Sequence, residues 1–306
     1  MTGDLVWRIH RELDTLAATI RSGSVEDGAV GLQHVLDGLR RDAHPEAWRT
    51  VATTVVQSHP VLHLIHESPF SRRAFEKPRG YAGDAHTLDL AYRMAQIPAE
   101  TTATGRRVSE CELESGTCRG IRARLDLMVE AIDQVAGEQE HARILSVACG
   151  HMREAQRSRA VAEDRVAELI AFDQDEESLR RISSEQPRAH AVQGSVRAIV
   201  TGAARWADLD FIYSAGLYDY LSDRFAAALT QSLFSMLRPG GRLLLANMTP
   251  ETNAGYLEAC MDWWMTYRDE EAMCRLADVL PSNQIASSRL FRDHTRHIVF
   301  LELRRA

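Results

Sequence analysis

Paired cysteine motifs, long apolar runs and an excess of positive charge are all missing from this chain of 306 residues. The five cysteines are an odd number with no Cys-x-x-Cys pair, so we expect reduced thiols in a cytoplasmic protein. No stretch approaches the roughly 20 apolar residues that a membrane span needs, and the first residues lack a signal-peptide pattern. The formal net charge of -7 disfavours a nucleic-acid partner, which normally meets a basic face.

The composition is that of a globular protein, with 45% apolar and 26% charged residues. Helical periodicity dominates the first 65 residues or so, beginning with apolar positions that recur at helical spacing between Val6 and Ile20. Further helices are expected at about 27–41, from Pro45, from Pro60, after Asp84 and at about 119–137. The polar stretch 98–118 is expected to be a lid or a linker.

The segment 69–84 differs in composition from the helices around it. It carries two prolines and two glycines among charged and aromatic residues. Pro78 and Gly80 would both disrupt a regular helix, so the segment is predicted to be an ordered loop. Ordered loops often carry functional residues.

From residue 141 the pattern changes to strands alternating with helices, which predicts a parallel α/β sheet with right-handed crossovers. Strands are expected at 143–148, 168–173, 190–193, 209–213, 242–247 and 298–303. The helices between them are expected at about 154–166, 176–184, 224–237 and 255–280.

Ligands bind such sheets outside the carboxyl ends of the strands, so the residues at those ends are the candidates for a site. The first expected strand is followed by Ala148-Cys-Gly-His-Met152, whose small residues permit a close backbone approach to a ligand. Asp173 ends the second strand, where an acid would hold a pair of ribose hydroxyls. The alternative for Asp173 is a helix cap before Glu176. The third and fourth strands end at Gly194-Ser195 and Ser214-Ala-Gly216.

This ordered set, together with Leu237-Arg-Pro-Gly-Gly-Arg-Leu243, resembles the class I S-adenosylmethionine (SAM)-dependent methyltransferases over residues 140–306. The resemblance implies an α/β Rossmann-like sheet, mostly parallel with an antiparallel C-terminal strand, in a SAM-binding domain at 121–306. An N-terminal helical domain at 1–120 would cover the pocket and select the acceptor. Its apolar helix faces are alternatively those of a homodimer interface.

Three further segments resemble a bacterial subgroup of this family. They are Phe75-Glu-Lys-Pro-Arg-Gly-Tyr-Ala-Gly-Asp84, Ala215-Gly-Leu-Tyr-Asp-Tyr-Leu221 and Asp262-Trp-Trp-Met-Thr-Tyr-Arg268. Members of the subgroup are often labelled as making 3-hydroxy fatty-acid methyl esters or as tailoring natural products. In the subgroup the Pro-Arg-Gly-Tyr-Ala-Gly-Asp loop closes over the cofactor pocket. The implied acceptor is a small molecule methylated on a carboxylate, hydroxyl or nitrogen.

The resemblance implies a role for each candidate residue. Asp173 would hold the ribose hydroxyls, and Asp84 and Arg124 would pair with the amine and carboxylate of SAM. Tyr81 and His151 are the candidate catalytic groups, and the alternative for His151 is a half-exposed loop histidine. The full cofactor-binding set is Tyr81, Asp84, Arg124, Ala148, Gly150, Asp173, Gln174, Ser195, Val196, Ser214, Ala215 and Gly216. The expected acceptor-binding residues are Tyr218, Asn247, Tyr256, Trp264, Tyr267 and Arg268.

The sequence departs from the family pattern in its first loop. The family commonly has an acid at the position of Ser146 and glycines at those of Ala148 and Met152, and only Gly150 is kept. The missing Gly-x-Gly-x-x-Gly disfavours the alternative of an NAD(P)-dependent oxidoreductase. A non-catalytic SAM-binding or assembly protein is the other alternative.

Two further patterns receive structural interpretations. His59, His63 and His66 share one helix face, but they lack evident carboxylate or cysteine partners apart from Glu67, so no metal is expected. Cys149 lacks a recognisable base partner and is interpreted as a packed small residue rather than a nucleophile.

Overall fold

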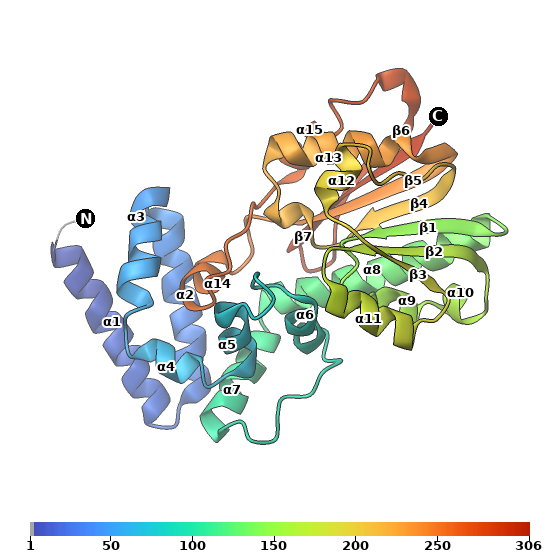
Figure 1. The fold of residues 1–306 in the computed structure, drawn as a ribbon. Coiled ribbons are helices and arrows are strands. Elements are labelled where there is room, and N and C mark those ends of the chain that lie inside the picture. The colour runs from blue at the N-terminus through green and yellow to red at the C-terminus, as the bar shows by residue number, and fades with distance from the viewer. Residues whose placement is uncertain (1–2) are drawn as a thin grey trace. The chain divides into compact units, whose positions relative to one another are not determined.

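The computed structural model describes residues 3–306, with side chains from Val6 onward, and divides the chain into two compact units. The helical unit comprises Met1–Arg119 and Glu251–Trp264, and the sheet unit comprises Gly120–Pro250 and Met265–Ala306 (Figure 1). The sequence assigned all of 121–306 to one domain. The structure differs at residues 251–264, which pack with the N-terminal helices.

The helical unit is built on amphipathic helices whose apolar faces meet, with Leu13, Leu32 and Leu36 fully buried. Its elements are α1 (Gly3–Arg21), α2 (Val25–Asp42), α3 (Pro45–Thr50), the π-helical turn η1 (Val51–Val56), α4 (Val61–Ile65), α5 (Pro69–Glu76), α6 (Ala85–Ala91), α7 (Ala103–Leu113) and α14 (Ala254–Cys260).

Segment 251–264 joins the helical unit through contacts between α14 and α2. A Cβ at Gly255 would lie 2.3 Å from the Leu36 carbonyl oxygen, so only glycine permits this close approach. Asp37 of α2 accepts hydrogen bonds from the backbone N–H groups of Gly255 and Tyr256, at 2.8 and 3.2 Å. The carboxylate thus caps orphan donors at the start of α14.

Two segments expected to be irregular contain helices. Residues 69–76 form α5, with Pro69 in its first turn, and the irregular part begins only at Lys77, which has a left-handed φ of 50°. The stretch 98–118 contains α7, whose Thr102 side chain accepts a hydrogen bond from the Gly105 N–H. Polar composition concealed this helix, although Val108 and Leu113 are buried apolar residues on it.

The sheet unit confirms the predicted class of fold. Its seven strands have the order β3-β2-β1-β4-β5-β7-β6, with β7 antiparallel to β5 and all pairs from β3 to β5 parallel. The strands are β1 (Ala142–Val147), β2 (Val166–Asp173), β3 (Ala189–Gln193), β4 (Leu209–Ser214), β5 (Leu237–Met248), β6 (Ile285–Arg292) and β7 (Ile298–Arg305).

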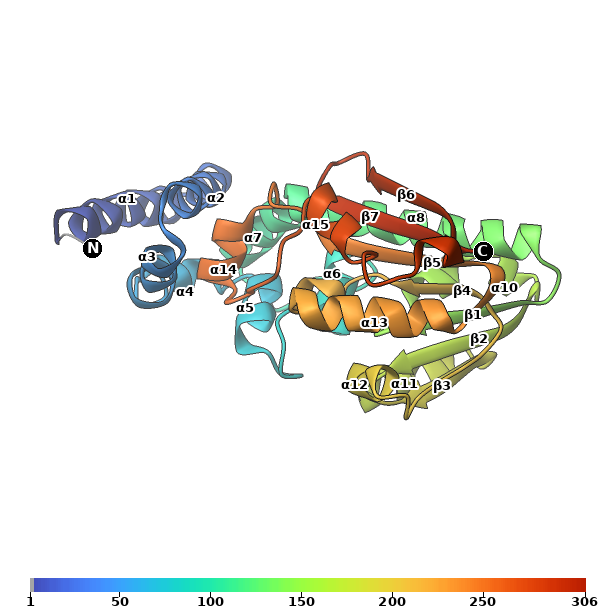
Figure 2. The same ribbon diagram turned by 90° about the horizontal axis from the view of Figure 1, so that it is seen from above.

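Helices cover both faces of this sheet (Figures 1 and 2). The helices of the unit are α8 (Gly116–Glu138, which starts in the helical unit), α9 (Arg153–Arg157), α10 (Arg159–Ala162), α11 (Glu176–Glu185), α12 (Val196–Val200), α13 (Asp223–Ser235) and α15 (Glu270–Arg275), with short 3-10 turns η2 (Tyr218–Tyr220) and η3 (Ser282–Gln284). Figure 2 shows the strands between α8 and α13. One hydrophobic cluster joins α13 and α15 to the sheet through Leu229, Leu233 and Met273.

Several boundaries differ from the sequence prediction. The Pro-Gly-Gly segment lies inside β5, where the pairing with β4 shifts register between Leu209 and Phe211. The helix expected at 154–166 breaks at Ser158, which caps α10. The helix expected at 255–280 is two short helices, α14 and α15. Strand β6 was missed because none of its side chains is buried and they show no apolar run.

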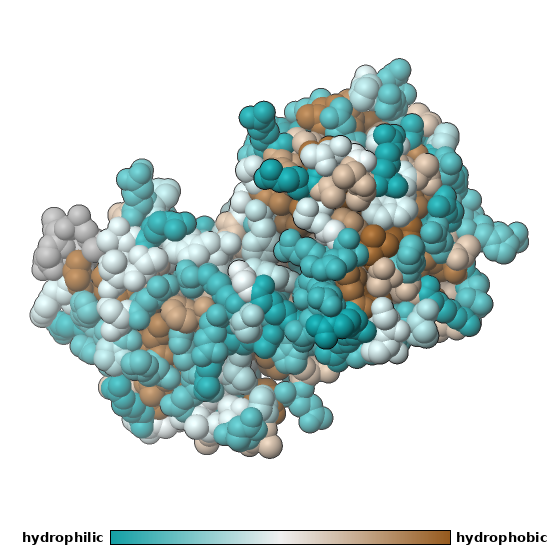
Figure 3. Space-filling model, in the orientation of Figure 1, coloured by the Kyte–Doolittle hydropathy of each residue, from teal (hydrophilic) through white to brown (hydrophobic). Residues whose placement is uncertain are grey.

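The surface and helix lengths bear on how the protein meets its surroundings. On the face seen in Figure 3, each unit is largely hydrophilic, with hydrophobic residues showing in patches. Among residues 3–306, no helix combines the length and apolar character needed to cross a bilayer.

Candidate functional site

The loop after β1 alternates between ordinary and left-handed backbone. Ala148, Gly150 and Met152 have φ values of 54°, 54° and 50°. A left-handed conformation costs an L-residue with a Cβ roughly 1–2 kcal/mol, whereas glycine adopts it freely. The resembled family commonly has glycine at positions 148 and 152, and this geometry gives the physical reason. Here alanine and methionine adopt the same turn.

Asp173, at the end of β2, faces this loop. Its Oδ2 accepts a hydrogen bond from the Gly150 N–H at 2.8 Å, and its Oδ1 accepts one from the Asp175 N–H at 2.9 Å. Burial raises the pKa of this carboxyl above its usual value, opposed by these backbone hydrogen bonds. A carboxylate offers about four acceptor positions, so it can still accept from a hydroxyl donor.

The alternative reading of Asp173 as a helix cap does not hold. The N-cap of α11 is Asp175, which accepts hydrogen bonds from the Glu177 N–H and the Ser178 hydroxyl. The sequence reasoning missed Asp175 in this role. Its position directly before Glu176 was the available signal.

The end of β4 lies beside the end of β1. The Ser214 hydroxyl donates to the Val147 carbonyl at 3.1 Å, while Ala215 and Gly216 are partly exposed. A Cβ at Gly216 would lie 3.3 Å from a guanidinium nitrogen of Arg124, which is buried on α8. Arg124 therefore reaches the strand ends.

Arg124 has acidic neighbours that the sequence reasoning did not single out. Its guanidinium lies 3.9 Å from Asp219. Burial raises the pKa of Asp219 to about 6, although the positive charge of Arg124 opposes this rise. Asp219 also accepts the Met248 N–H at 2.6 Å. Glu154 is buried and accepts the Tyr213 hydroxyl at 2.8 Å. Burial raises the pKa of Glu154, and Arg124 is among the groups that oppose the rise.

The signal for both acids was present in the sequence. Glu154 begins the helix expected at 154–166, two residues after the first loop, and Asp219 lies within the Ala215–Leu221 motif. Neither received a role, because spacing alone did not show that α8 would bring the buried Arg124 near these acids.

The residues after β2 and β3 surround the same strand ends. Gln174 and Ser195 are exposed, and Val196 is partly buried at the start of α12. Gly194 precedes Ser195, and a Cβ there would lie 2.6 Å from the Phe172 ring. Glycine is thus required for β3 to end against β2.

His151 and Cys149 are both buried in the first loop. His151 is 3% exposed, so the alternative of a half-exposed loop histidine is wrong. Burial raises the pKa of the Cys149 thiol well above its usual value, and neighbouring acids, led by Asp173, add to the effect. A thiol held neutral is a poor nucleophile, which agrees with its interpretation as a packed residue.

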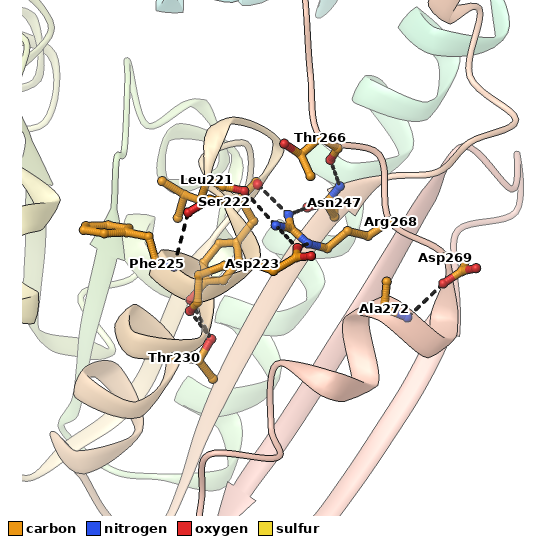
Figure 4. Close-up of polar contacts among 12 residues, drawn as sticks. Leu221, Ser222, Asp223, Phe225, Thr230, Asn247, Thr266, Arg268, Asp269 and Ala272 are labelled. Atoms are coloured by element: carbon orange, nitrogen blue, oxygen red, sulfur yellow. Dashed lines mark hydrogen bonds and ion pairs between the residues drawn. The ribbon is translucent and has the colours of Figure 1, made fainter. Parts of the chain in front are cut away.

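Three of the expected acceptor-binding residues hold the sheet unit together instead (Figure 4). The buried Arg268 guanidinium donates to the Tyr218 and Leu221 carbonyls and to the Asn247 side chain, each at 2.7 Å. It also pairs with Asp223 at 2.8 Å. Asn247 donates in turn to the Thr266 carbonyl at 2.8 Å. The Tyr218 ring is fully buried, and its hydroxyl shares a 3.0 Å hydrogen bond with Thr230. These contacts favour structural roles.

The other expected acceptor residues are distributed over both units. Tyr267 belongs to the sheet unit, whereas Tyr256 and Trp264 belong to the helical unit. The Tyr256 hydroxyl donates to Glu112 at 2.7 Å, and the Trp264 indole N–H donates to Asp262 at 2.6 Å. The Arg49 guanidinium lies over the Trp264 ring, 4.3 Å from its centroid.

Tyr81 and Asp84 also lie in the helical unit. Tyr81 is partly buried, and Asp84 is fully buried as the N-cap of α6. Asp84 accepts two hydrogen bonds from Arg73, at 3.1 and 2.6 Å, and one from the Thr87 N–H. Burial alone would raise the pKa of Asp84, but these partners lower it overall. Both oxygens already accept hydrogen bonds within the helical unit, which favours a structural role for Asp84.

The histidine series on α4 and its neighbours makes local contacts. His59 Nδ1 accepts the Val61 N–H at 3.1 Å, and His59 Nε2 lies 3.3 Å from Asp14. His66 Nε2 bonds the Cys260 carbonyl at 2.8 Å. These two histidines therefore point to different partners rather than to a shared centre.

Comparison with known proteins supports the fold. No protein-family model matches the chain. No curated protein matches it either. The chain is similar to the structure of a possible exported protein from Bordetella parapertussis, with a TM-score of 0.63 and 18% identity over 90% of this chain and 96% of that one. It is also similar to a candidate methyltransferase from Thermobifida fusca YX, with a TM-score of 0.52 and 14% identity over 80% and 98%.

Proposed function

We propose that this chain is a SAM-dependent methyltransferase that acts on a small-molecule acceptor. The observation that carries the proposal is Asp173, fixed at the end of β2 by the Gly150 N–H and still able to accept from a ribose hydroxyl. The fold shared with a candidate methyltransferase is consistent with it.

The residues around the first loop fit the cofactor's other groups. The loop has three left-handed positions, which bring its backbone close to the space beyond β1. It lacks the glycine pattern that a dinucleotide pyrophosphate needs, whereas SAM carries no phosphate. Arg124 offers a buried guanidinium beside Gly216, suited to a carboxylate.

When bound, SAM supplies an activated methyl group, whose carbon bonds to the acceptor's lone pair while the carbon–sulfur bond breaks and its electrons stay on sulfur. The chain's own task is mainly to hold the reacting atoms in line and close together. Ser214, Ala215 and Gly216 would line the reaction centre at the end of β4. A base is needed only for an acceptor that must lose a proton, and Tyr81 and His151 are our candidates.

The acceptor class that we propose follows the resemblance of the Pro-Arg-Gly-Tyr-Ala-Gly-Asp loop. It is a hydroxy fatty acid or a specialised metabolite, methylated on a carboxylate, hydroxyl or nitrogen. We also propose a cytoplasmic location, which the five free cysteines support.

Calorimetric titration with SAM, S-adenosylhomocysteine and NADH tests the cofactor. We expect micromolar binding of both sulfur ligands and at least 100-fold weaker binding by Asp173→Ala, because charge-assisted hydrogen bonding to the ribose would be lost. Asp175→Ser is the matched control. It retains a good N-cap residue for α11 and should leave both affinities within about threefold.

The outcomes separate the alternatives. Absence of binding by both sulfur ligands would overturn the proposal, and NADH binding in their place would favour an oxidoreductase. Binding without methyl transfer to any acceptor in a broad screen would favour a non-catalytic SAM-binding protein.

A further inference from the structure

The Ala215–Leu221 motif contains a buried acid, Asp219, to which the proposed function gives no role. Asp219 lies in the η2 turn, just beyond the carboxyl end of β4, where the candidate site is located. Its side chain is buried, as is that of Arg124 on α8, and the two approach within 3.9 Å. Two buried groups of opposite charge are therefore neighbours at the strand ends.

The two carboxylate oxygens of Asp219 have different neighbours. Oδ1 accepts the Met248 N–H at the end of β5, at 2.6 Å. Oδ2 lies 3.9 Å from a guanidinium nitrogen of Arg124. That separation is longer than a hydrogen bond, so the contact is an ion pair. One oxygen thus anchors the side chain to the sheet, while the other is the neighbour of the arginine.

The backbone around Asp219 is anchored as well. The Asp219 carbonyl accepts the Thr266 N–H at 2.7 Å. The carbonyl of the preceding Tyr218 accepts a hydrogen bond from the buried Arg268 guanidinium, also at 2.7 Å. Asp219 is therefore fixed through both its backbone and its side chain. A residue fixed in this way can hold a longer and more flexible side chain in one orientation.

Arg124 has a second acid near it. Glu154 of α9 is buried and accepts the Tyr213 hydroxyl at 2.8 Å, and Arg124 opposes the rise that burial causes in the Glu154 pKa. A guanidinium is always charged, so Arg124 is attracted to both carboxylates. A Cβ at Gly216 would lie 3.3 Å from the guanidinium, so Arg124 lies against the end of β4. The charge of Asp219 favours this position over one paired with Glu154 alone.

We propose that Asp219 is a positioning residue, which holds the Arg124 guanidinium towards the carboxylate of bound SAM. The inference rests on the proposed function, because it requires SAM to bind at the strand ends and Arg124 to receive its carboxylate. Asp219 acts through Arg124 and does not itself contact the cofactor. A guanidinium that turned away would lose the paired hydrogen-bond geometry that a carboxylate favours.

Asp219→Asn breaks the ion pair and keeps the anchor. The amide oxygen of asparagine can still accept the Met248 N–H, and the uncharged amide nitrogen then takes the place of Oδ2. Calorimetric titration compares SAM with decarboxylated SAM, which lacks only the carboxylate. We expect the variant to bind SAM at least tenfold more weakly than the unaltered protein does, and decarboxylated SAM within about twofold. A merely structural role would weaken both ligands equally.

Asp210→Asn is the matched control. Asp210 is a buried acid at the start of β4, the opposite end of the same strand. It likewise accepts a backbone N–H, that of Arg143 at 2.7 Å, and pairs with an arginine, Arg238, at 2.5 Å. Because it lies at the edge of the sheet away from the candidate site, its substitution should leave the affinity for each ligand within about twofold.

Arg124→Gln tests whether Asp219 acts through Arg124. Alone, it should weaken SAM binding at least tenfold and remove the preference for SAM over its decarboxylated form. When it is combined with Asp219→Asn, SAM binding should weaken by no more than about a further twofold, since the positioned group is already absent. Additive losses would give Asp219 an independent role and overturn the inference.

A crystal structure of the unaltered protein with S-adenosylhomocysteine gives a test that needs no variant. Arg124 should contact the ligand carboxylate and stay within about 4 Å of Asp219. An arginine that binds the carboxylate while turned away from Asp219 would overturn the inference, as would unchanged or tighter SAM binding by Asp219→Asn. Equal weakening of both ligands would overturn it and retain the cofactor. Failure of the proposed function is distinct, because the unaltered protein would then bind neither SAM nor S-adenosylhomocysteine, and the inference would fall with it.

Discussion

Two deeply buried charged groups, Arg268 in the sheet unit and Glu112 in the helical unit, are satisfied in different ways. In the sheet unit, the buried Arg268 meets two carbonyls, an amide and the Asp223 carboxylate, and Arg124 lies beside Asp219. In the helical unit, Glu112 is as deeply buried but is held by hydroxyl groups. Arg268 is thus held by an opposite charge within the sheet unit, whereas burial among hydroxyl groups raises the pKa of Glu112 to about 7.

The largest effect should come from breaking the balance in the sheet unit. Arg268→Leu removes every donor from a buried network and leaves the Tyr218 and Leu221 carbonyls without their partner. We expect a loss of about 3–5 kcal/mol in the free energy of unfolding, measured with urea. The exposed Arg275→Leu on α15 should change it by less than about 0.5 kcal/mol. A loss under about 1 kcal/mol for Arg268→Leu would show that the network is dispensable.

The next effect concerns the pH dependence of the helical unit. Because the folded pKa of Glu112 is raised to about 7, the folded protein binds more protons than the unfolded chain between about pH 4.5 and 7. The stability contribution of this carboxyl should therefore fall as pH rises through that window, by an order of about 3 kcal/mol. Urea unfolding at several pH values measures it.

The Glu112→Gln variant isolates this contribution. It is needed because Asp219 of the sheet unit, with a pKa of about 6, changes its protonation in the same pH range. The difference in unfolding free energy between Glu112→Gln and the unaltered protein should vary with pH. A constant difference from pH 4.5 to 8 would contradict the raised pKa.

A smaller effect should follow from loosening the contact between α14 and α2. Gly255→Ala places a methyl group against the Leu36 backbone and should destabilise the helical unit by about 1–3 kcal/mol. Gly38→Ala on α2 is its control. No atom lies within 4 Å of a Cβ there, so alanine should stabilise the helix by about 0.5–1 kcal/mol. Hydrogen exchange of α2 and α14 measures both changes, and equal protection in the two variants would refute the close contact.

The smallest effect tests the strained loop of the sheet unit. Ala148→Gly relieves a left-handed alanine and should raise the unfolding free energy by about 1 kcal/mol or less. Ala162→Gly, at an exposed position in α10, should lower it by about 0.5–1 kcal/mol. Matching signs for the two substitutions, measured by thermal unfolding, would argue against backbone strain at Ala148.

Sequence periodicity predicted the sheet unit well because buried strands and amphipathic helices have distinct apolar patterns. Strands β1 to β5 and β7 were expected within a few residues, whereas the exposed β6 gave no apolar signal. In the helical unit, α7 and α5 were hidden by polar and proline-rich composition. Burial of one narrow face, as at Val108 and Leu113, was enough to form α7.

The residues of the candidate site also fall into two groups, those that the sequence placed at strand ends and those whose contacts it did not predict. The sequence placed Asp173, Gly150 and Ser214 at strand ends, because a parallel sheet brings those ends to one edge. It assigned Arg268, Asn247 and Tyr218 to an acceptor pocket. In the structure Arg268 donates hydrogen bonds to the Tyr218 carbonyl and the Asn247 side chain, and the Tyr218 hydroxyl bonds to Thr230. Residue type alone does not show whether a polar side chain is satisfied internally.

The sequence by itself determined the succession of strands β1 to β5 and β7, the turn after β1 and the acid at the end of β2, since each depends on local pattern and spacing. Only the tertiary structure decided that residues 251–264 join the N-terminal helices and that Glu112 is buried among hydroxyls. Those outcomes depend on contacts between residues far apart in the chain, such as Glu112 and Tyr256, and on the burial that those contacts create.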